Sequence, residues 1–188
     1  MIPKVEFRYS MVYDRIWMKG EPKSREFMLK YINDVAKLWR KKENKILYEM
    51  QKITGLKWKE KRIICYVNSR GRSFSEPLTV IYNKDKNDFV DTLTHEMIHQ
   101  IQIQGAKNFP EWVGYLKRKY PNGNPIFLRH ILLHAVHKRL FLELFDKKRL
   151  NREIKSHQPY PDYKRAWDVV EEEGYENIIK DFKRVMKL

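Results

Sequence analysis

The sequence predicts an α+β fold in which a small sheet packs among helices. Apolar residues recur at helical spacing over residues 25–53, 88–104 and 125–145, whereas 61–68 and 77–83 are short segments rich in β-branched residues. The chain has 188 residues, of which 42% are apolar and 34% charged, so it is long enough to bury a core of its own.

The N-terminal part predicts one extended element and one long helix. Residues 4–18 alternate between apolar and polar types, which favours a strand or a short hairpin. Ser24 is a suitable cap for a helix over 25–53, and Gly55 is a suitable stop. The expected buried side of this helix consists of Phe27, Tyr31, Ile32, Val35, Leu38, Leu47, Met50 and Ile53.

Two strands are predicted next, at 61–68 and 77–83, joined by a loop rich in Ser, Arg and Gly. The first strand contains Cys65, the only cysteine, which excludes an internal disulfide and predicts a buried thiol in a reducing cytoplasm. We expect no signal peptide and no membrane span, because the N-terminus has no uninterrupted apolar segment and no stretch approaches bilayer length.

A helix is predicted from about 88 to 104. Residues 83–87 supply a turn and an Asn cap, Asp88 and Asp91 place acid in the first turn, and Gly105 ends the helix. Its expected apolar face consists of Phe89, Val90, Leu93, Met97, Ile98 and Ile101.

This helix carries the pattern HExxH, formed by His95, Glu96 and His99, which lie outside its apolar face. Histidines four residues apart share one helix face, so both imidazoles can reach one metal ion, with Glu96 beside it. The alternative is a pair of solvated histidines on a surface helix. We favour a Zn²⁺ site, because the motif lies on a capped helix with a separate apolar face.

The C-terminal half is predicted to be helical. We expect a short helix around 111–119, a helix over 125–145 that begins at Asn124-Pro125, and a last helix pair over 163–187. A polar linker is expected over 151–162. We therefore expect a catalytic domain over 1–150 and a helical extension over 151–188 that packs on the same domain.

Three histidines, His130, His134 and His137, form one stripe of the apolar helix over 125–145. Buried imidazoles need partners, so we expect one of them to be the third metal ligand. His130 is preferred and His134 is the alternative. The reason is that His130 lies about as far from the Asn124 cap that begins its helix as His99 lies from Gly105, which ends the helix with the HExxH motif. The reserve ligands are Glu111, Glu143 and Glu171 to Glu173. Tyr115, Tyr120 and His157 are candidates for stabilising an oxyanion, although a structural role is favoured for each.

The order of a helix, two strands, the HExxH helix and a backing helix over residues 24–145 resembles the catalytic core of gluzincin-type and SprT-like zincins. The resemblance implies a zinc peptidase with His95 and His99 as ligands and Glu96 as general base. It also implies a substrate-binding edge strand within 72–82. The chain lacks the Glu-x-x-x-Asp element of gluzincins and the Gly and His that continue the motif in metzincins.

The net charge of +15 has two interpretations. Residues 37–62 contain ten Lys or Arg and three Glu, with Trp39, Tyr48 and Trp58 among them, a composition that can follow a phosphate backbone. The alternative, which we favour, is a solvated helix face whose aromatic side chains are core, because no nucleic-acid motif accompanies the charge.

Together these features predict a small, cytoplasmic, zinc-dependent peptidase acting on peptides or proteins. An SprT-like protease on DNA-associated proteins, or a nucleic-acid-binding protein with a structural metal, is the alternative. A third hypothesis is a latent enzyme whose C-terminal helices cover the active site. Frequent Lys, Ile and Tyr with one Cys is also typical of thermophile proteins.

Overall fold

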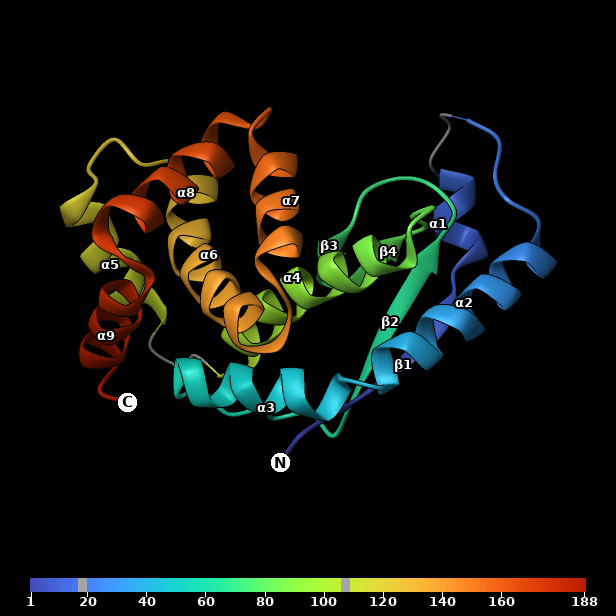
Figure 1. The fold of residues 1–188 in the computed structure, drawn as a ribbon, viewed down its shortest axis with the longest axis horizontal. Helices are drawn as coiled ribbons and strands as arrows, with labels where there is room; N and C mark the ends of the chain where they lie inside the picture. Colours follow the sequence, from blue (N-terminus) through green and yellow to red (C-terminus); the bar gives the residue numbers. More distant parts are fainter. Residues whose placement is uncertain (17–19, 106–108) are drawn as a thin grey trace. The chain divides into compact units, whose positions relative to one another are not determined.

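A computed structural model describes residues 1–16, 20–105 and 109–188 (Figure 1). Over these residues the chain forms nine helices and one four-stranded mixed sheet, which confirms the α+β class. The chain divides into two compact units: unit 1 comprises residues 1–48 and 58–100, and unit 2 comprises residues 49–57 and 101–188.

The elements follow one another along the chain in this order. They are β1 (Lys4–Tyr9), α1 (Met11–Ile16), α2 (Arg25–Arg40), α3 (Glu43–Thr54), β2 (Arg62–Asn68), β3 (Phe74–Ser75), β4 (Leu78–Ile81), α4 (Lys86–Gly105), α5 (Phe109–Lys119), α6 (Pro125–Leu144), α7 (Lys147–His157), α8 (Pro161–Glu173) and α9 (Tyr175–Met186). The predicted boundary at residue 150 lies within α7, in unit 2.

The sheet of unit 1 has the strand order β1-β2-β4-β3. The strand β2 is parallel to β1, with Lys4 opposite Arg62, and is also parallel to β4. The short strand β3 runs antiparallel to β4 and forms one edge. The predicted strands at 61–68 and 77–83 are thus confirmed as β2 and β4, and an edge strand does lie within 72–82.

The expectation of a strand or hairpin over 4–18 was wrong in its second half. The strand β1 ends at Tyr9, and the helix α1 follows it. The side chain of Ser10 accepts a hydrogen bond from the backbone of Tyr13, and its carbonyl accepts one from Asp14. A serine cap therefore starts a helix where the alternation had suggested a strand. Residues 17 and 18 lie outside the described residues.

The single helix expected over 25–53 is two helices, α2 and α3. After α2 the backbone N–H of Lys42 bonds to the carbonyl of Trp39, which tightens the turn. The buried carboxylate of Glu43 then accepts hydrogen bonds from the Trp39 indole, at 3.0 Å, and from the backbone N–H of Val5 in β1, at 2.8 Å. The break is therefore stabilised by a contact with a distant strand.

The part of α4 up to Gln100 belongs to unit 1 and packs into its core. The ring of Phe89 lies 6.2 Å from Phe7 of β1 and 5.7 Å from Tyr31 of α2, measured between centroids. All six residues of its predicted apolar face are at most 4% exposed, so that prediction is confirmed. Asp85, rather than an asparagine, caps the helix: its carboxylate accepts from the backbone of Asn87.

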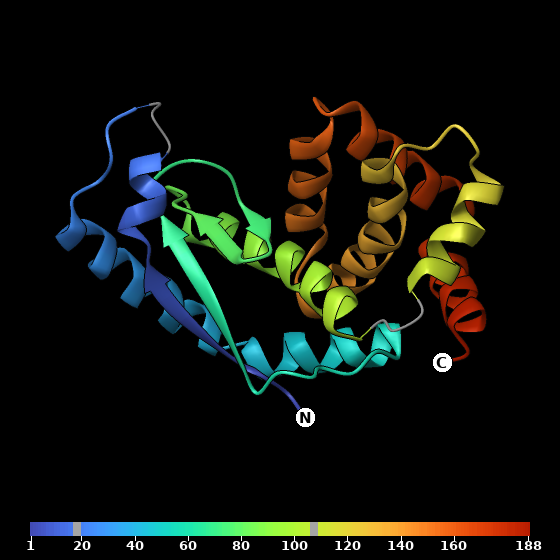
Figure 2. The same cartoon turned by 180° about the vertical axis from the view of Figure 1, so that it is seen from behind.

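In unit 2, α6 packs against α5, α7, α8 and α9, the helices drawn from yellow to red in Figure 2. The cap predicted for α6 is confirmed, because Asn124 Oδ1 accepts from the backbone of Phe127 at 2.9 Å. The short helix and the last helix pair are also confirmed, as α5, α8 and α9. The expectation of a polar linker over 151–162 was wrong, because the residues up to His157 continue α7. In this helix the side chain of Leu150 is buried.

The aromatic side chains of the basic segment 37–62 are mostly core. Trp39 and Trp58 are buried, whereas Tyr48 is exposed. This supports the favoured interpretation of the segment as a solvated surface over a core. Among the described helices, none is long and apolar enough to cross a membrane.

Candidate functional site

The HExxH residues lie in the part of α4 that belongs to unit 1. The imidazole rings of His95 and His99 approach each other edge to face, with their centroids 5.3 Å apart, as expected for positions one turn apart. His95 is buried and His99 is half-buried. The two rings therefore present their nitrogens from one helix face, as the sequence predicts.

Glu96 is a buried carboxyl group, only 7% exposed. Desolvation raises its pKa to about 8, well above that of a solvated glutamate. On the neighbouring strand β2, burial also raises the pKa of the Cys65 thiol, and the charge of Glu96 raises it further. Cys65 is thus a buried neutral thiol in a strand, as predicted, and Glu96 is placed to exchange a proton near neutral pH.

The residue after the motif connects α4 to the edge of the sheet. The side-chain amide of Gln100 donates to the backbone carbonyl of Ser75 in β3 and lies 3.4 Å from the Glu76 carboxylate. Gln100 is buried. The edge strand β3 is therefore held against the helix one residue beyond His99.

In unit 2, His130 lies on α6 and is buried. Its Nδ1 lies 2.7 Å from the carbonyl oxygen of Ile126, one turn earlier. Because a carbonyl only accepts, Nδ1 carries the proton, and in the neutral ring Nε2 then keeps its lone pair. Desolvation lowers the pKa of His130, so the neutral form dominates at pH 7. With Nδ1 protonated, Nε2 is the nitrogen through which His130 could bind a metal ion.

His134 has different surroundings. Its ring is stacked on the indole of Trp167, with centroids 4.2 Å apart and planes within 10°, and it is stacked at 5.2 Å on His157 of α7. The imidazole of His134 thus packs against two aromatic rings, as a core residue does.

Glu153, which lies outside the predicted set, joins this cluster together with His137 of the predicted histidine stripe. The indole N–H of Trp167 donates to His157 Nδ1 at 3.0 Å, and His157 Nε2 lies 3.6 Å from the Glu153 carboxylate. The donor atoms of Glu153 and His137 lie within 4.8 Å of each other. The i, i+4 spacing of Glu153 and His157 could have indicated this pair from the sequence, but a linker rather than a helix was expected there.

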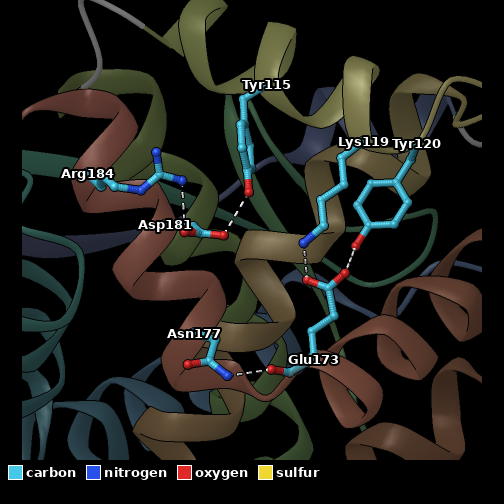
Figure 3. A network of polar contacts seen from close by, with 7 residues as sticks. All are labelled: Tyr115, Lys119, Tyr120, Glu173, Asn177, Asp181 and Arg184. Carbon is cyan, nitrogen blue, oxygen red and sulfur yellow. Dashed lines mark hydrogen bonds and ion pairs between the residues drawn. The ribbon is translucent and has the colours of Figure 1, made fainter.

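Most of the glutamates named as reserve ligands, and both Tyr115 and Tyr120, form ion pairs or hydrogen bonds within unit 2. Glu143 is paired with Arg139 and Glu171 with Lys138, while Glu111 is exposed. Figure 3 shows a polar network in which Glu173 accepts from Lys119 and Tyr120, and Asp181 accepts from Tyr115 and Arg184. These contacts agree with the structural role favoured for both tyrosines.

Within unit 1 the structure brings together His95, Glu96 and His99, and within unit 2 it brings together His130, His134 and His157. The third-ligand assignment stays a prediction. No protein-family model matches the chain, and neither does any curated protein sequence or solved structure.

Proposed function

We propose that this chain is a zinc-dependent peptidase in which Glu96 is the general base. The observation that carries the proposal is the placement of three groups on α4: two imidazoles 5.3 Å apart and, between them in sequence, a buried carboxyl group. Surface histidines would not require the burial of His95 and Glu96.

The donor set fits Zn²⁺, which is typically bound by imidazole nitrogens in peptidases. His95 and His99 would hold the ion, and the sequence predicts His130, then His134, as the third ligand. The Nδ1–H of His130 bonded to the Ile126 carbonyl supports His130, because this leaves Nε2 as a donor atom. When bound, Zn²⁺ supplies Lewis-acid chemistry, polarising a carbonyl and making water more acidic.

Glu96 would move the proton. Its ionised carboxylate accepts a proton from the attacking water, and the resulting carboxylic acid gives that proton to the amide nitrogen of the leaving group. Burial favours the second step, since a desolvated carboxyl group binds its proton more tightly, as its pKa of about 8 indicates. A positive charge beside it would favour the first step.

The substrate class follows from the edge strand. An edge strand offers backbone N–H and C=O groups to an extended peptide, which it binds by adding a strand. The bond between Gln100 and Ser75 keeps β3 beside the residues of the motif. We therefore propose an extended peptide or protein segment as substrate, and a cytoplasmic location, which the single buried cysteine supports.

The experiment compares three zinc-loaded proteins: wild type, Glu96→Gln and His95→Ala/His99→Ala. Each is dialysed, assayed for zinc, and incubated with a denatured protein substrate whose fragments are identified by mass spectrometry. We expect one zinc per chain in wild type and Glu96→Gln, none in the double variant, and cleavage by wild type alone. Cleavage by Glu96→Gln at the wild-type rate would refute Glu96 as the base, and zinc retained in the double variant would refute the site.

A further inference from the structure

The hydrogen bonds beside β4 show which of its residues face β3. Just after β4, the backbone N–H of Tyr82 bonds to the carbonyl of Asn68, at the end of β2. The preceding backbone N–H, that of Ile81, bonds on the other side, to the hydroxyl oxygen of Ser73 beside β3. Backbone groups alternate between the two sides along a strand, so Thr79 faces β3 as Ile81 does.

The same alternation identifies the residue of β3 that faces outward. Phe74 lies opposite Thr79, so its backbone groups face β4, and those of Ser75 face the free edge. The contact of Ser75 agrees with this, because its carbonyl accepts a hydrogen bond from the side-chain amide of Gln100 on α4. Gln100 therefore lies on the free edge of β3, where the substrate strand is proposed to pair.

The carboxylate of Glu76 lies at the same place. Glu76 follows β3 directly, and one of its carboxylate oxygens lies 3.4 Å from the Gln100 nitrogen that donates to Ser75. Gln100 in turn follows His99, the last residue of the motif. An exposed carboxylate thus stands at the end of the free edge, in contact with the residue that follows a proposed zinc ligand.

The charge of Glu76 is available to a substrate. Its contact is with a neutral amide, and no cation of residues 1–16, 20–105 and 109–188 forms an ion pair with it. The carboxylate of Asp34, also in unit 1, is instead paired with Lys86 at 2.7 Å. Because a carboxylate accepts about four hydrogen bonds, one amide leaves room for a further donor that carries a positive charge.

We propose that Glu76 gives the peptidase a preference for substrates with a Lys or Arg side chain where the bound strand passes the end of β3. This inference rests on the proposed function and adds the class of substrate residue that its site selects. The net charge of +15 repels basic segments at long range, so a preference for them requires a local carboxylate. The ion pair with the substrate is partly exposed, so it changes cleavage by about fivefold.

The test uses the zinc-loaded full chain and a mixture of N-terminally acetylated peptides of varied sequence. Acetylation removes the α-amino group as an alternative cation, and mass spectrometry maps the cleaved bonds. We expect Lys and Arg to be enriched at one position relative to the cleaved bond with wild type, but not with Glu76→Gln. A cleaved peptide is then compared with analogues that carry Gln or Glu in place of that basic residue. Wild type should favour the basic peptide over the Gln analogue about fivefold in kcat/KM, and Glu76→Gln should cleave the two equally.

The matched control is Glu26→Gln, which makes the same change at an exposed glutamate of α2 and should keep the wild-type preference. The charge reversal Glu76→Lys should favour the Glu analogue instead. If this reversal fails to fold, as judged by circular dichroism, the comparison between wild type and Glu76→Gln decides.

Failure of this inference differs from failure of the proposed function. If wild type cleaves peptides without a basic preference, or if Glu76→Gln keeps that preference, the inference is overturned and the peptidase stands. Slower cleavage of all three peptides alike by Glu76→Gln would also overturn it, since Glu76 would then only hold Gln100 in place. No cleavage of any peptide by zinc-loaded wild type would overturn both.

Discussion

Glu43 and Glu96 are buried glutamates of unit 1 with different surroundings. The carboxylate of Glu43 accepts two hydrogen bonds, from Trp39 and Val5, and so joins α2, α3 and β1. The pKa of Glu96 is instead raised by desolvation alone. A carboxylate held by two donors is suited to a structural role, whereas a desolvated one is suited to proton transfer.

Replacing Glu43 should therefore reduce stability. We expect Glu43→Ala to lower the free energy of unfolding by about 3 kcal/mol, because it leaves two buried N–H groups without their charged acceptor. Urea unfolding followed by circular dichroism measures this. Glu26→Ala, at an exposed position in the first turn of α2, serves as the control and should change stability by less than about 1 kcal/mol. Equal effects of the two substitutions would contradict the structural role.

The third ligand can be tested at the same scale. We expect His130→Ala to weaken zinc binding strongly and to abolish cleavage, because the Nδ1 of His130 is bonded to a carbonyl and its Nε2 can bind the ion. We expect His134→Ala to weaken zinc binding less, because its ring is stacked on Trp167 as in a core residue. Competition with a chelator gives the zinc affinities, and Arg129→Ala, at the exposed neighbouring position, is the control. Full zinc affinity in both histidine variants would exclude His130 and His134 as the third ligand. The glutamates, including Glu153, would then become the candidates.

At the level of elements, the proposed site depends on how α4 meets the edge of the sheet. The helix carries the three motif residues, and the strand β3 supplies the free edge. The side chain of Gln100 joins them by donating a hydrogen bond to the carbonyl of Ser75. The position of the proposed substrate strand relative to Glu96 therefore depends on a hydrogen bond as well as on packing.

Gln100→Ala should accordingly raise KM by about fivefold or more while zinc affinity stays at the wild-type value, because the substitution releases the edge strand and leaves the imidazoles in place. Peptide-cleavage kinetics and hydrogen exchange at β3 measure the two effects. Gln102→Ala is a close control, since it changes the same type of buried residue in the same helix. A wild-type KM with unchanged exchange at β3 would show that Gln100 does not position the strand.

On the scale of the whole molecule, each unit has its own buried core. Because the core of unit 2 contains buried histidines, the stability of this unit depends on pH. His137 packs edge to face on Phe141, with centroids 4.2 Å apart, and is completely buried. Desolvation, with a contribution from His157, lowers its pKa to about 3. Since the unfolded chain has a histidine pKa of about 6.5, it takes up this proton at higher pH than the folded chain does.

Stability of the metal-free protein should therefore be highest above pH 6.5 and fall as the pH decreases towards 3. The part due to His137 is about 2 kcal/mol between pH 6.5 and 5, since each unit of pKa difference corresponds to about 1.4 kcal/mol. His137→Phe, which keeps an aromatic ring, should reduce the pH dependence in this window by that amount. Urea unfolding at both pH values measures it, and an unchanged dependence in the variant would contradict the prediction.

The sequence by itself determined the features that depend on near neighbours. The start of α6 follows from Asn124 and Pro125, and the buried face of α4 follows from apolar spacing. The approach of His95 and His99 follows from helix geometry alone. Each of these rests on residues within a few positions of one another, so their physical causes are visible in the sequence.

Only the tertiary structure decided the features whose partners are distant in the chain. The break between α2 and α3 is stabilised by a bond from Val5 to Glu43, and β3 is held by a bond from Gln100 to Ser75. The residues expected to be a polar linker are helical as far as His157, because the side chain of Leu150 is buried in unit 2 and holds the helix there. A local pattern gives each segment its tendency, but burial and hydrogen bonds to distant residues select among the conformations that the pattern allows.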